Sequence, residues 1–369
     1  MPPLGVIDMK NMNYWSGRKV LVTGHTGFKG SWLVAYLINL GAEVIGISDS
    51  IELNHISWST FRRQYLIKEY FCDIRDSVAI KKIFLDEKPE ITFHLAAEAI
   101  VSKCQKDPLK AIQVNVMGTA NILDCLQSLS FEQTAIFVTT DKVYLSNNLG
   151  NPHFENDKLG GNEIYSASKS ASEMIIQGFI KSFFEKNEKN VNVAVVRAGN
   201  VLGGGDWGED RLVPDFYKAL QDHRQIKLRN PSGIRPWQHV LDLIHGYILL
   251  AEFVHSKKAT QGSTWNFSNP KLDFTVEELV NALSHAHSLD KSIVQIASTD
   301  HAFIEENFLA INSDKAKNLI GFKSFFGKVE LVESLAEWYT AYIKGHSDVL
   351  EVSNTQLTKH IEWRGNDNK

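Results

Sequence analysis

The chain has 369 residues, of which 43% are hydrophobic and 22% charged, and its formal net charge at pH 7 is -4. This composition excludes collagen-like, coiled-coil and disordered chains, and the length predicts two domains or one large α/β domain. The small net charge gives no reason to expect nucleic acid or an anionic membrane as a partner. No apolar run approaches the roughly 20 residues that span a bilayer, and the N-terminus has no signal-peptide core, so we expect a cytoplasmic protein.

Neither the cysteines nor the histidines have the spacing of a structural or metal site. Cys72, Cys104 and Cys125 are far apart, which excludes a disulfide framework and a cysteine-based zinc site. His285 and His287 stand two residues apart at the end of a predicted helix, so they point to different faces. We therefore predict no bound metal.

Short β-branched runs alternate with helical stretches through the first half of the chain. Alternation with short connectors predicts βαβ units, and hence an α/β fold with a doubly wound parallel sheet of the Rossmann type, covered by helices on both faces. The predicted strands are Lys19–Val22, Ala42–Ser48, Gln64–Phe71, Glu90–His94, Thr134–Thr139 and Val191–Val196. The predicted helices are Ser31–Leu40, Asn115–Ser128 and Ser166–Phe184.

Three glycines follow the first predicted strand and open the first predicted helix. Gly24, Gly27 and Gly30 allow a tight turn, close approach of the backbone to a pyrophosphate, and close packing of the helix on the strand. This context predicts a dinucleotide-binding turn. Asp49 closes the second strand, where a carboxylate can hold the adenosine ribose and repel a 2′-phosphate, which favours NAD over NADP. Asp73 is a candidate contact of the adenine, and the alternative for both carboxylates is a surface turn.

A second pattern indicates proton transfer. Tyr165 and Lys169 are four residues apart on a predicted helix, so they share a face, and the lysine can lower the pKa of the phenol and hold a nicotinamide ribose. Thr140 follows a strand end, where active sites of open α/β sheets form. The three side chains predict a relay in which the tyrosinate takes an O–H proton as hydride leaves carbon. A solvated helix surface is the alternative for the Tyr–Lys pattern alone.

The regular alternation stops after Arg197, where glycines and prolines indicate a loop-rich stretch. Beyond it the pattern predicts helices at Asp242–Val254, Val276–His285 and Val329–Ile343, and a strand at Thr264–Phe267. We predict an NAD-binding Rossmann domain over residues 15–197 with a returning segment near 240–268. A smaller α/β substrate-binding domain would comprise 198–239 and 269–352, and the polar tail 353–369 is expected to be poorly ordered.

The chain resembles the extended short-chain dehydrogenase/reductases, and among them the nucleotide-sugar 4,6-dehydratases, from about Trp15 to Tyr342. Three long stretches, 22–32, 197–207 and 229–240, most resemble the type that acts on a CDP-linked sugar. Other marks of the family are His94–Ala97, Asn115, Thr140–Lys142, Tyr165 with Lys169, and Arg197–Asn200. The resemblance implies NAD as cofactor, held by Gly24, Thr26, Gly27, Phe28, Lys29, Gly30, Asp49, Asp73, Ile74, Leu95, Ala96, Ala97, Tyr165 and Lys169.

The resemblance also implies a reaction: oxidation at C4 of the sugar, loss of water across C5 and C6, and return of hydride to C6. Tyr165 would remove the O4 proton while Thr140 hydrogen-bonds the same oxygen, with Lys169 as their partner. Asp141, where simple epimerases of the family lack an acid, would protonate the departing O6 hydroxyl. Lys142 would be the C5 base if burial or a nearby cation lowers its pKa. Alternatively Lys142 stays charged and stabilises the enolate.

For the substrate, the resemblance implies a CDP-sugar held at its diphosphate and nucleoside. Asn200 would bind near the diphosphate, and Arg235 would neutralise it, because a guanidinium matches phosphate geometry with two parallel donors. Arg229 would contact the nucleoside beside a backbone strip at 212–214. The predicted substrate contacts are Glu98, Asn115, Asn200, Leu212, Val213, Arg229, Arg235 and His239.

Four positions depart from the family pattern. Glu98, Ser102 and Gln105 stand where the family usually has Gln and nearby Arg and Tyr, and Ile164 replaces a proline before the tyrosine. They bear on which hexose is accepted and on the regiochemistry, and Glu98 is an alternative candidate for the C5 base. Two other functions remain open: a related dehydratase or epimerase acting on another sugar nucleotide, of which Asp141 disfavours the epimerase, and a catalytically silent NAD-binding regulator. The resemblance further implies deoxysugar (lipopolysaccharide O-antigen) biosynthesis and a homodimer formed by the helices near 115–128 and 166–184.

Overall fold

The computed structural model describes residues 14–49, 56–146, 150–185, 191–228, 230–256, 262–289, 294–296, 308–345 and 349–367. The main sheet is formed by β1 (Lys19–Thr23), β2 (Glu43–Ser48), β3 (Lys68–Phe71), β4 (Ile91–His94), β5 (Gln133–Val138), β6 (Val191–Ala198) and β10 (Ser263–Phe267). Neighbouring strands are parallel, in the order β10-β6-β5-β4-β1-β2-β3. The order reverses between β1 and β4, where open α/β sheets bind their ligands. The prediction of a doubly wound parallel sheet is confirmed.

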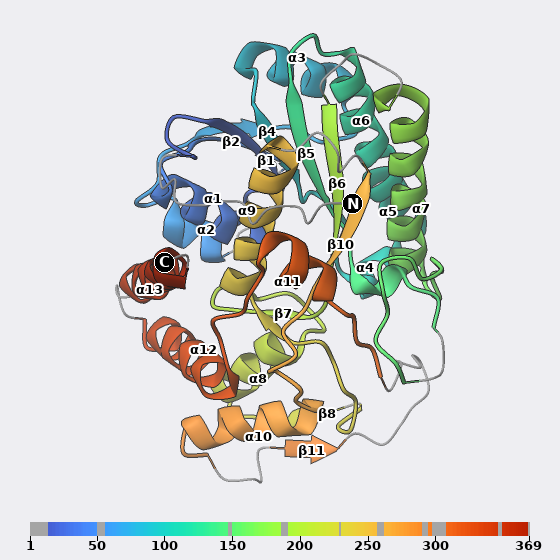
Figure 1. The fold of residues 1–369 in the computed structure, drawn as a ribbon. Coiled ribbons are helices and arrows are strands. Elements are labelled where there is room, and N and C mark those ends of the chain that lie inside the picture. Colours follow the sequence, from blue (N-terminus) through green and yellow to red (C-terminus); the bar gives the residue numbers. More distant parts are fainter. Residues whose placement is uncertain are drawn as a thin grey trace.

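Helices cover both faces of this sheet and build most of the remaining structure (Figure 1). In the first half they are α1 (Phe28–Asn39), α2 (Ile56–Phe61), α3 (Ser77–Glu87), α4 (Val101–Lys106), α5 (Pro108–Ile112), η1 (Gln113–Gly118), α6 (Thr119–Ser128), η2 (Asp141–Val143), α7 (Ile164–Phe179) and η3 (Ile180–Phe184). In the second half they are α8 (Leu212–Gln221), α9 (Val240–Ser256), α10 (Val276–Ala286), α11 (Asp314–Ile320), α12 (Lys328–Ile343) and α13 (Val349–Asp367).

The central strands are apolar on both sides because two separate cores enclose the sheet. In β1, Val20 and Val22 enter the core that contains α1 and α9, whereas Leu21 enters the core that contains α3, α6 and α7. In β6, Val196 and Val195 divide in the same way. Successive side chains of a strand point to opposite faces, so a strand covered on both faces reads as a continuous apolar run. This is why the β-branched runs identified the strands.

The chain leaves the sheet after β6 and later returns to it. Strand β10 pairs with the outer edge of β6, with Trp265 opposite Val196. Helix α9 lies against β5 and β6, and it is buried from Val240 to Val254. The segments 240–256 and 263–267 therefore belong to the sheet and its covering layer, although they follow a long stretch of chain that builds the other part of the fold.

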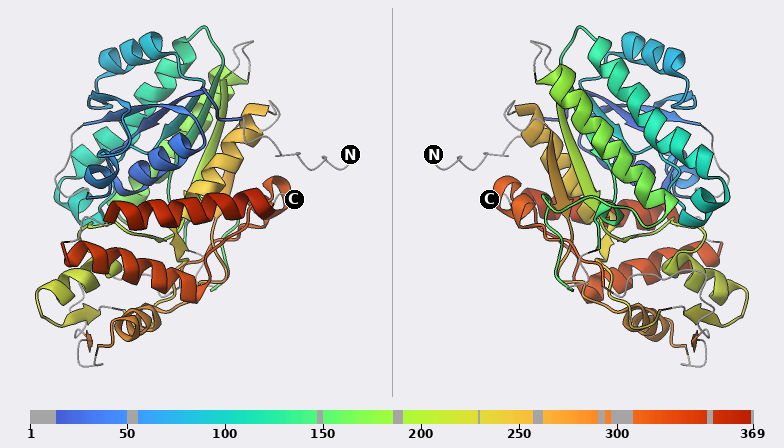
Figure 2. Two further views of the ribbon diagram at one scale, coloured as in Figure 1. Left: turned by 90° about the vertical axis from the view of Figure 1, so that its left-hand side faces the viewer. Right: turned by 90° about the vertical axis from the view of Figure 1, so that its right-hand side faces the viewer.

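The rest of the second half forms a smaller part at the carboxyl edge of the sheet, built around α8, α10 and α12 (Figures 1 and 2). Two short parallel pairs of strands lie within it: β7 (Val201–Leu202) with β9 (Gln238–His239), and β8 (Ile226–Leu228) with β11 (Val294–Ile296). The pair β7–β9 lies next to α9 and so connects this part to the sheet.

The polar segment that was predicted to be poorly ordered is a helix. Helix α13 runs along the junction between the two parts (Figure 2) and packs against α2 and α12. Polar contacts attach it to α9: His360 Nε2 lies 3.1 Å from Asp242 Oδ1, and Arg364 Nη2 donates to Glu252 Oε1 at 2.5 Å. The helix is held by buried polar side chains, which hydropathy does not detect.

Two further helices occupy stretches for which the sequence predicted no element. Helix α8 lies in the stretch read as loop-rich; Pro214 is in its first turn, where an amide hydrogen has no partner within the helix. Helix α3 begins at Asp76, whose side chain accepts a hydrogen bond from Ala79 N at 3.0 Å. Within the ranges described above, no helix is long and apolar enough to cross a membrane.

Candidate active site

The turn between β1 and α1 is folded so tightly that it leaves no room for a side chain at Gly24 or Gly30. Gly24 has a φ of +74°, and a Cβ there would lie 2.8 Å from the backbone nitrogen of Ala96 at the end of β4. A Cβ on Gly30 would lie 2.1 Å from the carbonyl oxygen of Gly24. The start of α1 therefore packs directly on the turn, and both lie at the point where the strand order reverses.

The first turn of α1 is suited to bind an anion. Its N-cap is Gly27, which has no side chain to cap the helix, and the first turn contains no acidic residue. The N–H groups at the start of a helix and the positive end of its dipole then face the approaching ligand. Thr26 Oγ1 lies 2.7 Å from Ser48 Oγ, which attaches the turn to the end of β2. These residues fit the diphosphate of a dinucleotide.

The predicted contacts of the adenosine follow the next two strands. Asp49 is exposed directly after β2. Asp73 follows β3 and accepts from Arg75 Nη2 at 2.6 Å, and this hydrogen bond holds the pKa of Asp73 below its ordinary value. Ile74 is buried, and its side chain fills the space beside Gly118. Asp49, Asp73 and Ile74 therefore lie at the end of the sheet where the glycine turn lies.

The end of β4 lies directly beside the glycine turn. Leu95, Ala96 and Ala97 are half-buried there. Leu95 N donates to the carbonyl oxygen of Thr23 at 3.1 Å, and Ala96 N donates to Thr23 Oγ1 at 3.2 Å. The last residue of β1 thus holds this segment against the glycine turn.

Asn115 has a different role from the substrate contact predicted for it. Its side chain is buried within η1, and its amide is fully used by neighbouring groups of the protein. Asn115 Oδ1 accepts from Glu98 N at 2.8 Å, and Nδ2 donates to Glu98 O at 3.1 Å and to Ser168 Oγ at 2.9 Å. Asn115 therefore fixes the loop that carries Glu98, while the Glu98 side chain stays half-buried beside the crevice.

Two predicted catalytic side chains come from the start of α7. The N-cap Glu163 accepts from the backbone nitrogen of Tyr165 at 2.6 Å, which defines where the helix begins. Lys169 lies one turn further on and is buried, and its Nζ donates to the carbonyl oxygen of Val138 at 2.9 Å. The face of α7 that carries Tyr165 and Lys169 is thus docked on the carboxyl end of β5.

Burial dominates the pKa values of both groups. It raises the pKa of Tyr165 to about 12, opposed by a hydrogen bond with the Thr140 hydroxyl and by the charge of Arg211. It lowers the pKa of Lys169 to about 8, and the charge of Lys29 adds to this effect. The sequence predicted that Lys169 lowers the pKa of Tyr165. In the structure the lowering contributions come from Thr140 and Arg211.

Asp141 is placed to carry a proton. Its carboxyl is 2% exposed at the start of η2, and Oδ1 accepts from Thr140 Oγ1 at 3.0 Å. Oδ2 is buried and has no hydrogen-bond partner among the described residues. Burial raises the pKa of Asp141 to about 6, although the charge of Lys142 and the Thr140 hydroxyl oppose the shift. A buried carboxyl that holds its proton near neutral pH can act as a general acid.

Lys142 does not have the environment that the C5 base requires. That role needs burial or a nearby cation to lower the pKa of the lysine, and the side chain of Lys142 is exposed. Its backbone nitrogen donates to Thr140 Oγ1 at 3.3 Å, and its charge acts to lower the pKa of Asp141. The structure therefore favours the alternative role, in which Lys142 acts on the neighbouring Asp141.

Cations from both parts of the fold converge on this site. Arg211, directly before α8, donates through Nη1 to Asp206 Oδ1 at 2.9 Å and Oδ2 at 2.8 Å. Burial and the charge of Arg211 lower the pKa of Lys29 to about 8, while Asp141 and Asp206 oppose the shift. Arg211 is not among the site residues predicted from the sequence. Its position five residues after Asp206, directly before a helix, is the pattern that could have indicated the Arg211–Asp206 pair.

Two predicted diphosphate contacts lie beyond the carboxyl end of β6. Asn200 and Arg235 are both half-buried. The pairing of β7 with β9 brings their segments together, and Gln238 N donates to the carbonyl oxygen of Asn200 at 3.0 Å. Arg235 Nη1 donates to the carbonyl oxygen of Ile234 at 2.9 Å.

The structure places three other predicted substrate contacts differently. His239 is fully buried, with its ring stacked 3.7 Å from the ring of Phe326, so it does not reach a ligand. Leu212 and Val213 begin helix α8 instead of forming a backbone strip, and Val213 is buried. Arg229 lies outside the described residues.

The remaining departures from the family pattern lie near the start of α4 and α7. Ser102 is half-buried on α4, and its hydroxyl has no partner in the described part of the chain; Gln105, on the same helix, is exposed. Ile164 occupies the first position of α7, where proline is tolerated but not needed.

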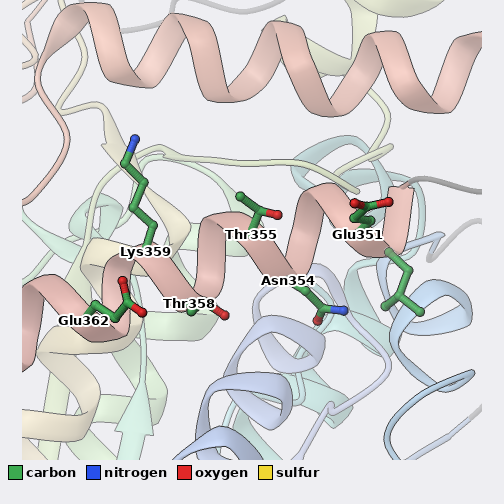
Figure 3. A pocket seen from close by; sticks show the side chains of 7 residues that line it. Glu351, Asn354, Thr355, Thr358, Lys359 and Glu362 are labelled. Carbon is green, nitrogen blue, oxygen red and sulfur yellow. The ribbon is translucent and has the colours of Figure 1, made fainter.

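A shallow hollow outlined on the surface lies elsewhere, along the side of α13 (Figure 3). None of the predicted site residues lines it, and we assign it no role. Nor do the described ranges contain a group of three or more His, Cys, Asp or Glu residues that could hold a metal ion. The lining residues are Leu350, Glu351, Asn354, Thr355, Thr358, Lys359 and Glu362.

The glycine turn, the strand order and the Thr–Tyr–Lys group agree with the result of comparison with known proteins. The chain belongs to the NAD dependent epimerase/dehydratase family, whose model matches residues 20–266. A CDP-glucose 4,6-dehydratase from Salmonella typhimurium is 34% identical to it over 357 residues, which cover 96% of this chain and 99% of the relative.

Solved structures share the fold at lower identity. A dTDP-glucose 4,6-dehydratase from Bacillus anthracis in complex with NAD has a TM-score of 0.76 at 20% identity, covering 90% of this chain and 100% of that one. A UDP-glucose 4-epimerase from Thermotoga maritima has a TM-score of 0.74 at 21% identity, covering 88% of this chain and 99% of that one. Since both reaction types use this fold, the reaction has to be argued from the site.

Proposed function

We propose that this protein is a CDP-glucose 4,6-dehydratase that forms CDP-4-keto-6-deoxyglucose with NAD as its cofactor. The supporting observation is Asp141: a buried carboxyl with one unpartnered oxygen and a pKa raised to about 6, directly after the Thr140 hydroxyl. Removal of the sugar O6 hydroxyl needs an acid, whereas inversion at C4 does not. The choice of a CDP-sugar rests on the 34% identity to the relative from Salmonella typhimurium.

NAD fits the crevice at the glycine turn. The close packing at Gly24 and Gly30 brings the turn against the uncapped start of α1, whose N–H groups would donate to the diphosphate. Asp49 would hold the adenosine ribose and disfavour a 2′-phosphate. When bound, NAD takes hydride from C4 of the sugar and returns it to C6.

The side chains of the site divide the proton transfers between them. Tyr165 takes the O4 proton, and the Thr140 hydroxyl, which acts to lower the pKa of the phenol, orients the same oxygen. Asp141 gives its proton to the departing O6 hydroxyl, which leaves as water, while a base takes the C5 proton. Glu98, half-buried just beyond β4, is the candidate for this base. Lys142 stays charged at the edge of the site and favours the negative charge of the enolate. Arg235 and Asn200 bind the diphosphate.

Incubation of the purified protein with CDP-glucose, without added cofactor, tests this function. We expect a sugar nucleotide lighter by one water in the mass spectrum, and turnover without any external reductant, because hydride is returned within each cycle. CDP-glucose that stays unchanged even with NAD added, while UDP- or dTDP-glucose loses water, would refute the CDP assignment. If all three stay unchanged, the dehydratase assignment itself is refuted.

We also propose that the protein is a homodimer formed through the helices near 115–128 and 166–184, which are η1, α6 and α7, together with the adjoining α5. These elements pack against one another and leave a group of apolar side chains exposed. Exposed apolar side chains gathered on elements that pack together are typical of an interface with a partner. The extended short-chain dehydrogenase/reductases that the chain resembles pair through these helices. The exposed residues are Leu109, Ile112, Met117, Met174 and Ile175.

If the dimer forms through these helices, one charge introduced into the exposed apolar group should prevent it. Met174 is 61% exposed, so Met174→Lys should not disturb the fold but should yield a monomer in size-exclusion chromatography with light scattering. Val329→Lys is the matched control, because Val329 is 64% exposed at the start of α12, away from this group. The same molar mass for Met174→Lys and the unaltered protein would contradict this interface.

A further inference from the structure

One buried ion pair lies behind the catalytic turn, by which we mean residues 140–143. Arg197 of β6 donates to the carboxylate of Glu173 of α7, from Nε at 3.0 Å and from Nη2 at 2.5 Å. The two side chains are only 4% and 3% exposed. A fully buried, two-pronged pair of this kind is rigid, because separating it would leave a buried charge without a partner. The reaction proposed above makes no use of it.

The pair holds the residue that enters the catalytic turn. Thr139 is the last residue before it, and its Oγ1 donates to Glu173 Oε1 at 2.6 Å. Its backbone nitrogen donates to the carbonyl oxygen of Val196 at 2.8 Å, so both the side chain and the main chain of Thr139 are tied down. Glu173 therefore fixes the residue that directly precedes the Thr140 hydroxyl.

The same pair holds the residue that leaves the turn. Tyr144 is the first residue after it, and the guanidinium carbon of Arg197 lies 4.6 Å from the centre of its ring. The Tyr144 hydroxyl donates to Asn266 Oδ1 at 2.7 Å, and Arg197 Nη1 donates to the carbonyl oxygen of Glu155 at 3.0 Å. The ion pair of Arg197 and Glu173 thus contacts the residues on both sides of the catalytic turn: Glu173 binds Thr139, and Arg197 stacks on Tyr144.

Glu173 also connects the turn to the helix that carries the tyrosine. It follows Lys169 by four residues and Tyr165 by eight, so all three lie on one face of α7. We infer that Glu173 and Arg197 are positioning residues, which set the Thr140 hydroxyl and the Asp141 carboxyl at their working places relative to the Tyr165 phenol. For its kinetic consequences the inference rests on the function proposed above.

Thr139 offers the sharpest test, because substitution of Glu173 or Arg197 would strand a buried charge and threaten the fold. Thr139→Val removes the hydroxyl and keeps the shape. A misplacement on the order of 1 Å costs about 100-fold in rate, so we expect kcat to fall roughly 10- to 100-fold with KM nearly unchanged. Thr139→Ser, which keeps the hydroxyl, should restore most of this loss.

The control for general destabilisation is Thr92→Val. Thr92 is a fully buried threonine of β4 whose hydroxyl lies 3.5 Å from Gln133 Oε1, with no contact to the catalytic turn. It should retain the kcat of the unaltered protein. Amide hydrogen exchange, which needs no substrate, should become faster over residues 139–145 in Thr139→Val and stay unchanged there in Thr92→Val.

The results separate the two proposals. Unaltered kcat and exchange in Thr139→Val, or a loss of kcat equally large in Thr139→Ser, would overturn the positioning role. If the unaltered protein dehydrates no sugar nucleotide, the proposed function fails. The exchange comparison then still decides whether the hydroxyl of Thr139 holds the catalytic turn.

Discussion

Tyr165→Phe is expected to lower kcat by roughly 1,000-fold while NAD stays bound, because general acid–base groups contribute about 10²- to 10⁴-fold. The phenol is carried by α7 one helical turn before the buried Lys169, and the Thr140 hydroxyl acts to lower its pKa, so it is the group placed to exchange a proton with the sugar O4. Phenylalanine fills the same space but carries no proton. Mass spectrometry of the sugar nucleotide measures turnover, and the nicotinamide released on denaturation measures bound cofactor.

A second tyrosine provides the matched control for this variant. Tyr65 is buried, accepts a hydrogen bond from Asn39 Nδ2 at 2.8 Å and donates one to Asn354 Oδ1 at 3.1 Å, with no part in the site. Tyr65→Phe should lower stability slightly and leave kcat unchanged. Full activity in Tyr165→Phe would show that Tyr165 is not the base. Loss of bound NAD together with activity would mean that Tyr165 acts by holding the cofactor.

Asp141→Asn should stop the reaction after oxidation at C4 and before loss of water. The sugar can still be oxidised at C4, because Thr140 and Tyr165 are unchanged, but the O6 hydroxyl no longer receives a proton. We expect loss of water to slow roughly 100-fold or more, so that reduced nicotinamide accumulates in the protein and is visible by its absorbance. If oxidation and water loss fall by the same factor, Asp141 is not a specific acid.

The same substitution should stabilise the fold, which separates loss of function from loss of structure. Burial raises the pKa of Asp141 from 3.8 to about 6, so the folded state favours the neutral carboxyl and loses stability as pH rises through this interval. A shift of about two pKa units corresponds to about 3 kcal/mol above pH 6. Asparagine carries no charge, so Asp141→Asn should be more stable than the unaltered protein at pH 8 and equal to it near pH 4. Chemical denaturation at both pH values measures this, and a less stable variant at pH 8 would contradict the raised pKa.

The sequence predicted the sheet well because its central strands, such as β5 and β6, are buried on both faces, whereas the edge strand β3 is not. Strand β5, for example, spans Gln133–Val138 where the pattern predicted Thr134–Thr139. Helix α13 was missed for the opposite reason. Its buried face contains Ser353, Gln356 and His360 as well as Leu357, and these polar residues find partners only in the folded structure. A hydropathy pattern cannot indicate a core made of hydrogen bonds.

Within the candidate site, residue spacing predicted which side chains share a helix face. It did not predict which side chains of a turn are buried and which are exposed. Tyr165 and Lys169 are neighbours because four residues make about one helical turn. Lys142 is exposed and Asp141 is buried although they are adjacent, because the short helix η2 turns one inward and the other outward. Arg211 could not be assigned from spacing at all. It reaches the site only because α8 lies across the carboxyl edge of the sheet.

The return of the chain to the sheet limits how such a protein can be recombined. Helix α9 covers β5 and β6, and β10 closes the edge of β6, yet both come from the far side of the stretch that contains Asn200 and Arg235. A fragment that ends after β6 would leave Val138 and Val196 without cover, and it should aggregate when expressed alone. Grafting a different sugar specificity onto this scaffold therefore requires two exchanged segments, one on each side of residues 240–267. A single crossover between genes would break the core.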